Sequence, residues 1–302
     1  LIFSGRFNDA SERALQRWLP AAGRQAGLTG EPAIQSGPGT VIFVDQRHSA
    51  GEVIRRHRRA GRLVVCIEDL GPGRSWANIL VDPNLDPRTH HRICRHHGAS
   101  PDLALLGPDH VLLAPVVRTL RRQVAGSSTS CLRVLLTFGG GDPDGISEKV
   151  LSFLLPVAGR YTITLVLGPL VSEKRVVALM KQANDRVRVV REPVSLPELM
   201  TANDLAVTVP GITLWELACL GVPSIVTWVR PHQRRMAHVF EKNGWGINAG
   251  PLKRLVGRRL VRELKNLSDS TTRRQHIRLQ ARKGVDGLGL DRLIETMFGS
   301  TL

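Results

Sequence analysis

The sequence predicts a two-domain α/β fold in which parallel strands alternate with helices. Short apolar, β-branched runs recur along the chain, and stretches with helical periodicity separate them. Most of these runs are apolar on both faces, as expected of strands that helices cover on both sides of a sheet. A length of 302 residues is ordinary for two such domains.

The predicted elements follow one another in the strand–helix order that is typical of βαβ units. The strands are expected at Thr40–Val44, Leu63–Ile67, Arg133–Phe138, Thr162–Leu167, Val187–Val190, Leu205–Val209 and Ser224–Trp228. The helices are expected at Ala50–Ala60, Ile146–Leu155, Lys174–Ala183, Leu196–Ala202, Leu214–Leu220 and His232–Lys242. The small, polar stretch Val124–Ser130 separates the halves, so the predicted domains span residues 1–125 and 126–302.

The charge and composition argue against nucleic-acid binding and favour an anionic ligand. The net charge is +16, but the basic residues are scattered and the chain has a single Tyr, so we expect no nucleic-acid partner. An anionic substrate, or a peripheral attraction to an anionic surface, accounts for the charge at least as well. The four cysteines lie far apart and no apolar run is long enough to span a bilayer, which favours a cytoplasmic protein with reduced thiols.

The first candidate site is the turn that follows the strand at Arg133–Phe138. Three glycines, Gly139, Gly140 and Gly141, precede Asp142 and Pro143. Glycines let the backbone approach a phosphate closely, and the amides of the next helix would form an anion site. The alternative is a tight turn with Asp142 as N-cap and Pro143 as the first helical residue. The spacing supports both interpretations equally.

The second candidate site is the start of the helix after the strand at Leu205–Val209. Gly211, Ile212 and Thr213 would present free amides to a diphosphate, and Glu216, one turn later, could accept hydrogen bonds from ribose hydroxyls. The same residues also form the pattern of a capping box, in which Thr213 and Glu216 close the helix start without a ligand. The pattern alone slightly favours the capping box.

The third candidate site is His232 with Gln233, after the strand at Ser224–Trp228. All three sites should emerge at the carboxyl edge of one parallel sheet, where such folds bind ligands. His232 could act as an acid or base, although a solvent-exposed histidine at a helix start is the commoner case. The histidines of Thr89–His97 match no common zinc spacing, because Arg92 and Arg95 interrupt them, so no metal or other cofactor is expected.

Taken in order, these segments resemble the family of the nucleotide-sugar hydrolase of pseudaminic acid biosynthesis and its spore coat polysaccharide relatives. A more distant resemblance is to the glycosyltransferase that adds N-acetylglucosamine to lipid-linked murein precursors. The strong matches are Thr137–Pro143, Asp204–Val207, Gly211–Glu216, Leu220–Pro223, Gln233 and Asp286–Gly289. The weaker matches are Val44–Asp45, Cys66–Leu70, Asp82–Leu85, Leu105–Pro108 and Leu112–Leu113.

The resemblance implies a protein of the GT-B superfamily, with two Rossmann-like domains, that binds a UDP-amino-sugar and releases UDP during surface polysaccharide or pseudaminic acid biosynthesis. The second domain would hold UDP, with Gly139–Gly141 and Gly211–Thr213 near the phosphates and Glu216 on the ribose. Gln233 would lie near the sugar or the diphosphate, and His232 stands where the family often has Asn. Helix amides would neutralise the diphosphate without a metal.

The chain departs from the family at its start. The family opens with a strand and a Gly-x-Gly-His segment that carries its expected catalytic histidine, and this sequence contains no Gly-His dipeptide. Leu1–Gly5 resembles the second βα unit, so the first domain is expected to lack its first unit, and no catalytic residue is assigned. Two alternatives stay open: a GT-B glycosyltransferase with an unknown acceptor, and an inactive paralogue that only binds a nucleotide-sugar.

Overall fold

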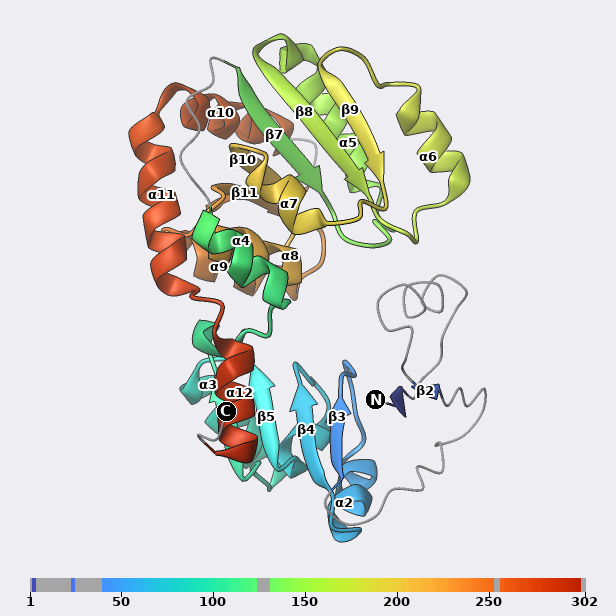
Figure 1. Cartoon of the computed structure of the whole chain (residues 1–302), viewed down its shortest axis with the longest axis vertical. Coiled ribbons are helices and arrows are strands. Elements are labelled where there is room, and N and C mark those ends of the chain that lie inside the picture. The colour runs from blue at the N-terminus through green and yellow to red at the C-terminus, as the bar shows by residue number, and fades with distance from the viewer. Residues whose placement is uncertain (1, 4–22, 25–39, 124–130, 253–255, 300–302) are drawn as a thin grey trace.

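The structure, a computed structural model, describes residues 2–3, 23–24, 40–123, 131–252 and 256–299. It confirms the predicted α/β class, with two parallel sheets that each carry helices (Figure 1). At the N-terminus the described residues form two short parallel strands, β1 (Ile2–Phe3) and β2 (Gly23–Arg24).

The first domain contains a four-stranded parallel sheet in the order β3-β4-β5-β6. Its strands are β3 (Val41–Val44), β4 (Leu63–Ile67), β5 (Ile79–Asp82) and β6 (Leu103–Leu106). The connections contain α2 (Gly51–Arg59), η1 (Pro72–Trp76), α3 (Pro87–His97) and η2 (Pro108–His110). Strands β5 and β6 were not predicted, because three or four apolar residues are too few to show a period.

The second domain contains six parallel strands in the order β12-β11-β10-β7-β8-β9. They are β7 (Leu132–Thr137), β8 (Tyr161–Leu167), β9 (Val187–Arg191), β10 (Leu205–Thr208), β11 (Ser224–Trp228) and β12 (Ile247–Pro251). The chain builds outward from β7 through β8 to β9, then returns to the other side of β7 and continues through β10 and β11 to β12. The switch point of this doubly wound sheet therefore lies between β7 and β10.

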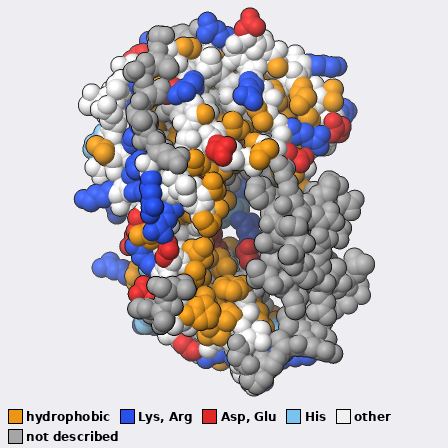
Figure 2. Space-filling model, viewed as in Figure 1, with side chains coloured by type: hydrophobic (Ala, Val, Ile, Leu, Met, Phe, Trp, Pro, Cys, Tyr) orange, Lys and Arg blue, Asp and Glu red, His pale blue; other side chains and the backbone are white. Residues whose placement is uncertain are grey.

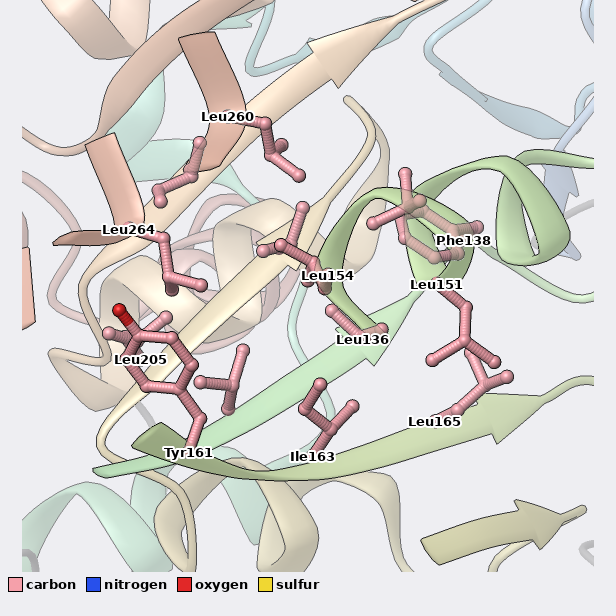
Figure 3. Close-up of a cluster of buried hydrophobic side chains, with 14 of the residues drawn as sticks. Leu136, Phe138, Leu151, Leu154, Tyr161, Ile163, Leu165, Leu205, Leu260 and Leu264 are labelled. Atoms are coloured by element: carbon pink, nitrogen blue, oxygen red, sulfur yellow. The ribbon is translucent and has the colours of Figure 1, made fainter. Parts of the chain in front are cut away.

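Hydrophobic cores cover both faces of the second sheet. Along β7, Val134 and Leu136 point into one core and Leu135 into the other, which explains why the strand is apolar on both faces. Figure 3 shows the first of these cores, in which Leu151 and Leu154 of one helix meet the sheet. The helices of this domain are α5 (Ile146–Leu154), η3 (Leu155–Arg160), α6 (Glu173–Met180), α7 (Leu196–Thr201), α8 (Ile212–Leu220), α9 (Gln233–Lys242), α10 (Val256–Asp269) and α11 (Thr271–Gly284).

Two helices pack on the domain that the predicted boundaries did not give them. Helix α4 (Pro115–Gln123) lies within the predicted first domain, yet its Val117 is buried in a core of the second. Helix α12 (Gly289–Phe298) lies within the predicted second domain, yet its Leu293 is buried against the first sheet (Figure 1). An amphipathic pattern shows that a helix has a buried face but not which sheet it covers. The predicted linker, Val124–Ser130, lies outside the described residues.

Across the described part of the chain, no helix combines the length and the apolar composition that crossing a membrane requires.

Candidate functional site

The three predicted loops lie together at the switch point of the second sheet. They follow β7, β10 and β11, which are neighbours in the sheet and parallel. The Thr208 hydroxyl donates to the Thr137 carbonyl over 2.8 Å and joins the ends of β10 and β7. The strands of the first sheet point their carboxyl ends toward the same region (Figure 1), and the surface between the domains is hollowed there (Figure 2).

The glycine-rich loop after β7 packs against the loop after β8 on one side and is open on the other. A Cβ at Gly168, in the next loop, would lie 2.4 Å from the Gly140 carbonyl oxygen, and the Leu170 amide donates to that oxygen over 2.9 Å. A Cβ at Gly139 or Gly140 would meet nothing within 4 Å, and Gly139 has a φ of +85°. The loop is therefore held from the β8 side, and its open face leaves room for a ligand.

The carboxylate of Asp142 caps α5 from a distance. Asp142 is 3% exposed, and its side chain accepts hydrogen bonds from the Ile146 amide at 2.7 Å and the Ser147 amide at 3.0 Å. The Arg175 guanidinium donates to the same carboxylate over 2.8 Å. The predicted helix start at Ile146 is confirmed, but two expectations are corrected: Gly145 rather than Asp142 is the N-cap, and the first amides of α5 are occupied by Asp142 rather than free for an anion.

The start of α8 is different, because its first amides are free. Helix α8 begins at Ile212, and its N-cap, Gly211, has no side chain with which to cap it. In the part of the chain that is described, the amides of Ile212 and Thr213 have no hydrogen-bond acceptor. Gly211 and Ile212 are exposed, and nothing lies within 4 Å of a Cβ at Gly211. The predicted capping box is wrong, because Thr213 lies inside the helix rather than at its N-cap.

Glu216 is therefore left without the partner that the capping box would have supplied. Its side chain is half-buried, and among the described residues it makes no hydrogen bond or ion pair. Burial raises the pKa of this carboxyl above its usual range. An unpaired, half-buried carboxylate is costly, and donors from a ligand would remove that cost.

Gln233 braces the loop between β11 and α9. Its side-chain carbonyl accepts hydrogen bonds from the amides of Val229 and Arg230, both at 3.0 Å. The side-chain NH₂ group has no acceptor within the described ranges, so it is the part of Gln233 that can reach a ligand.

His232 connects this loop to the first domain. The Arg47 guanidinium donates to Nε2 of His232 over 3.1 Å, and since arginine has no acceptor, Nε2 must be unprotonated. Burial, followed by the charges of Arg47 and Arg230, lowers the pKa of His232, so the ring is neutral at pH 7. A second link between the domains joins the guanidinium of Arg235 to the carboxylate of Asp86.

The first domain contributes acidic residues that the sequence analysis did not single out as site residues. Glu68 directly follows β4 and Asp82 ends β5, both at the edge that faces the second domain. The Asn84 side-chain amide donates to the Glu68 carboxylate over 2.9 Å, and Arg74 forms a buried ion pair with Asp82 at 2.9 Å. The sequence signal that could have identified them is an acidic residue at the end of an apolar strand, or directly after it.

The histidines of α3 bind neighbouring side chains. Nδ1 of His97 lies 2.8 Å from the Ser75 hydroxyl, and Nε2 of His90 lies 3.4 Å from the thiol of Cys94. Within the described residues, no group of three or more His, Cys, Asp or Glu side chains is placed to hold a metal ion.

No protein-family model matches the chain. Two curated proteins are similar to it. An uncharacterised protein of Methanocaldococcus jannaschii is 30% identical over 219 residues, which cover 70% of this chain and 45% of that protein. The spore coat polysaccharide biosynthesis protein SpsG of Bacillus subtilis is 25% identical over 189 residues, which cover 62% of this chain and 56% of SpsG. The chain spans about half the length of the curated relatives it matches.

Solved structures share the fold. The Anabaena protein HepE in complex with UDP and glucose is 14% identical with a TM-score of 0.58, covering 99% of this chain and 92% of HepE. A UDP-N-acetylglucosamine 2-epimerase is 14% identical with a TM-score of 0.56, covering 85% of this chain and 71% of the epimerase. The spinosyn rhamnosyltransferase SpnG with thymidine diphosphate is 19% identical with a TM-score of 0.55, covering 82% of this chain and 75% of SpnG. These likenesses confirm the GT-B fold.

Proposed function

We propose that this chain, a relative of the spore coat polysaccharide biosynthesis proteins with the GT-B fold, binds a UDP-sugar at the switch point of its second domain. The observation that carries the proposal is the start of α8, where the amides of Ile212 and Thr213 lie one turn before the carboxylate of Glu216 and none of these groups has a hydrogen-bond partner among the described residues. A diphosphate would accept hydrogen bonds from the amides, and ribose hydroxyls would donate to Glu216.

The surrounding loops fit the same ligand. The open face of Gly139 and Gly140 gives a sugar diphosphate access to the backbone, and the free NH₂ group of Gln233 can donate to it. The similarity to SpsG and the GT-B neighbours crystallised with UDP or thymidine diphosphate support this choice of ligand class. Phosphate charge would be neutralised by the amides and the positive end of α8, so the proposal requires no metal.

The proposed reaction is hydrolysis of the bond between the sugar and UDP, in which water attacks the anomeric carbon and UDP leaves. The alternative is transfer of the sugar to an acceptor hydroxyl, because one fold serves both reactions. Incubation with UDP-N-acetylglucosamine and other UDP-amino-sugars in water decides between them. Release of free sugar with UDP supports hydrolysis, whereas UDP release that depends on an added acceptor supports transfer.

Binding is tested by a proline at the first position of α8. Ile212→Pro removes one of the proposed phosphate donors, and proline at this position is compatible with a helix. The expected loss of one hydrogen bond to a charged group is about 1.5–3 kcal/mol, so UDP affinity in calorimetry should fall about tenfold or more.

The matched control is Glu173→Pro, at the first position of α6, whose N-terminus follows β8 rather than β10. This variant should bind UDP as the wild type does. If Ile212→Pro binds UDP with unchanged affinity, the start of α8 is not the phosphate site.

A further inference from the structure

Glu68 has a backbone conformation that residues other than glycine rarely adopt. It directly follows β4, and its φ is +47°. Its amide donates to the Val81 carbonyl over 2.9 Å, so the conformation is fixed by the neighbouring strand. Such strain in a non-glycine residue persists where the structure holds it in place, and it gathers at functional sites. A glycine here would relieve the strain, so the presence of a carboxylate calls for another explanation.

The carboxyl group of Glu68 is largely buried, with one hydrogen-bond donor and two other carboxylates nearby. The side-chain NH₂ group of Asn84 donates to it over 2.9 Å, while the side-chain oxygen of Asn84 is buried with no donor among the described residues. Burial, then the charges of Asp82 and Asp45, raises the pKa of Glu68 to about 7, against the weaker effects of the Asn84 hydrogen bond and Arg47. With a pKa of about 7, this carboxyl group can take up or release a proton near neutral pH.

The groups around Glu68 extend across to the proposed nucleotide site. Arg47, whose charge acts on Glu68, donates to His232 on the loop after β11. Asp82 is paired with the buried Arg74 and also lies within the field of Arg235, which belongs to α9. Glu68 thus belongs to the edge of the first sheet that faces the loops of the second domain (Figure 1).

We propose that Glu68 is the general base of the cleft, taking the proton from the water or hydroxyl that attacks the sugar held in the second domain. This inference rests on the proposed function. The nucleophile oxygen forms a bond to the anomeric carbon, its proton passes to the Glu68 carboxylate, and the carbon–oxygen bond to the diphosphate breaks with its electron pair on UDP. His232 is neutral and already accepts a hydrogen bond from Arg47, so its Nε2 is not available for this role.

The test compares Glu68→Gln with a matched control, Glu192→Gln. Glu192 also directly follows a strand with a positive φ, +44°, and its amide donates to the Leu167 carbonyl over 3.0 Å, but it is exposed at the outer strand β9. Release of UDP from UDP-N-acetylglucosamine and other UDP-amino-sugars is measured with UDP affinity by calorimetry. Glu68→Gln should lower kcat about 10²–10⁴-fold with unchanged UDP affinity, and Glu192→Gln should change neither.

The pH profile supplies a readout that a structural role would not move. In the wild type, kcat/KM should fall below an apparent pKa of about 7, since the base must be ionised. Glu68→Gly gives a second test that does not depend on tolerance of glutamine, because glycine suits the left-handed conformation. Added formate should restore part of the activity of Glu68→Gly.

Each outcome decides a separate point. Activity of Glu68→Gln or Glu68→Gly within threefold of the wild type overturns the role of Glu68. Failure of formate to restore activity to a folded Glu68→Gly variant that binds UDP also counts against it. UDP binding by the wild type without release of UDP from any donor overturns Glu68 as a base and leaves nucleotide binding standing. Absence of UDP binding instead refutes the proposed function.

Discussion

Replacing Glu216 with glutamine separates two roles that the sequence pattern could not distinguish. Glutamine keeps the size of the side chain but removes the charge. If Glu216 receives hydrogen bonds from ribose hydroxyls, UDP binding weakens. If the carboxylate were needed to close the start of α8, the fold would weaken instead. The structure predicts the first result, because Gly211 is the N-cap of α8 and Glu216 has no hydrogen-bond donor within the described residues.

The expected changes in UDP affinity and in stability follow from the burial and the missing hydrogen bonds of Glu216. Exchange of a charged acceptor for a neutral one removes about 1.5–3 kcal/mol per hydrogen bond, so the Kd for UDP should rise about tenfold or more. Stability should move in the opposite direction. Burial raises the pKa of Glu216 above its ordinary value of 4.5, so the ionised form is penalised in the fold, and the penalty grows as the pH rises above that value. At pH 7 the variant should be as stable as the wild type or more so.

The assay pairs calorimetry of UDP binding with thermal unfolding at pH 5 and pH 8. The wild type should lose stability relative to Glu216→Gln as the pH rises. Glu198→Gln is the control, because Glu198 lies in the first turn of α7, where Ser195 caps the helix, and it is exposed. Unchanged UDP affinity in Glu216→Gln, combined with a lower Tm at both pH values, would refute the reasoning.

Three further predictions concern the glycine-rich loop and its supports. Gly168→Ala should cost about 1–3 kcal/mol and weaken UDP binding, because its Cβ would lie 2.4 Å from the Gly140 carbonyl oxygen. Asp142→Asn should lower stability by about 1.5–3 kcal/mol, measured by urea unfolding, since its carboxylate caps α5 and binds Arg175. Hydrogen bonding from Arg175 lowers the pKa of Glu148, so the wild type should exceed Glu148→Gln in stability above pH 4.5 and lose that advantage as the pH falls further.

Each of these predictions has its own control. Gly98→Ala also strains a positive φ, at the end of α3, but meets nothing within 4 Å, so it should lower the Tm without changing UDP affinity. Within the described ranges the Asp144 carboxylate bonds to the side chain of Arg230, at 3.3 Å, so Asp144→Asn should cost less than Asp142→Asn. Equal UDP affinity in Gly168→Ala and Gly98→Ala would show that the glycine-rich loop is not part of the nucleotide site. A stability difference for Glu148→Gln that does not change with pH would contradict the ion-pair argument.

Much of the second domain could be predicted from the sequence, because its signals are local. The strand at Ser224–Trp228 was predicted with the bounds that the structure shows, and so was the strand at Leu63–Ile67 in the first domain, because short runs of mostly apolar residues between turn signals suffice. The loops at Gly139–Gly141 and Gly211 were identified for the same reason, as glycines that directly follow such strands. That these loops would share one edge followed from the parallel arrangement of the strands.

The tertiary structure decided the features that depend on residues far apart in the chain. Asp142 proved to be bound to Arg175, and Glu216 has no partner in the described part of the chain because α8 begins earlier than the capping-box pattern implied. Burial, and then the charges of Asp82 and Asp45, raise the pKa of Glu68, and these two carboxylates come near it only through the pairing of separate strands. Local periodicity fixes where a strand or helix forms, whereas burial, charge and hydrogen-bond partners arise from long-range packing. The sequence by itself therefore located the candidate nucleotide loops, and only the tertiary structure placed Glu68 at the edge of the first sheet that faces the second domain.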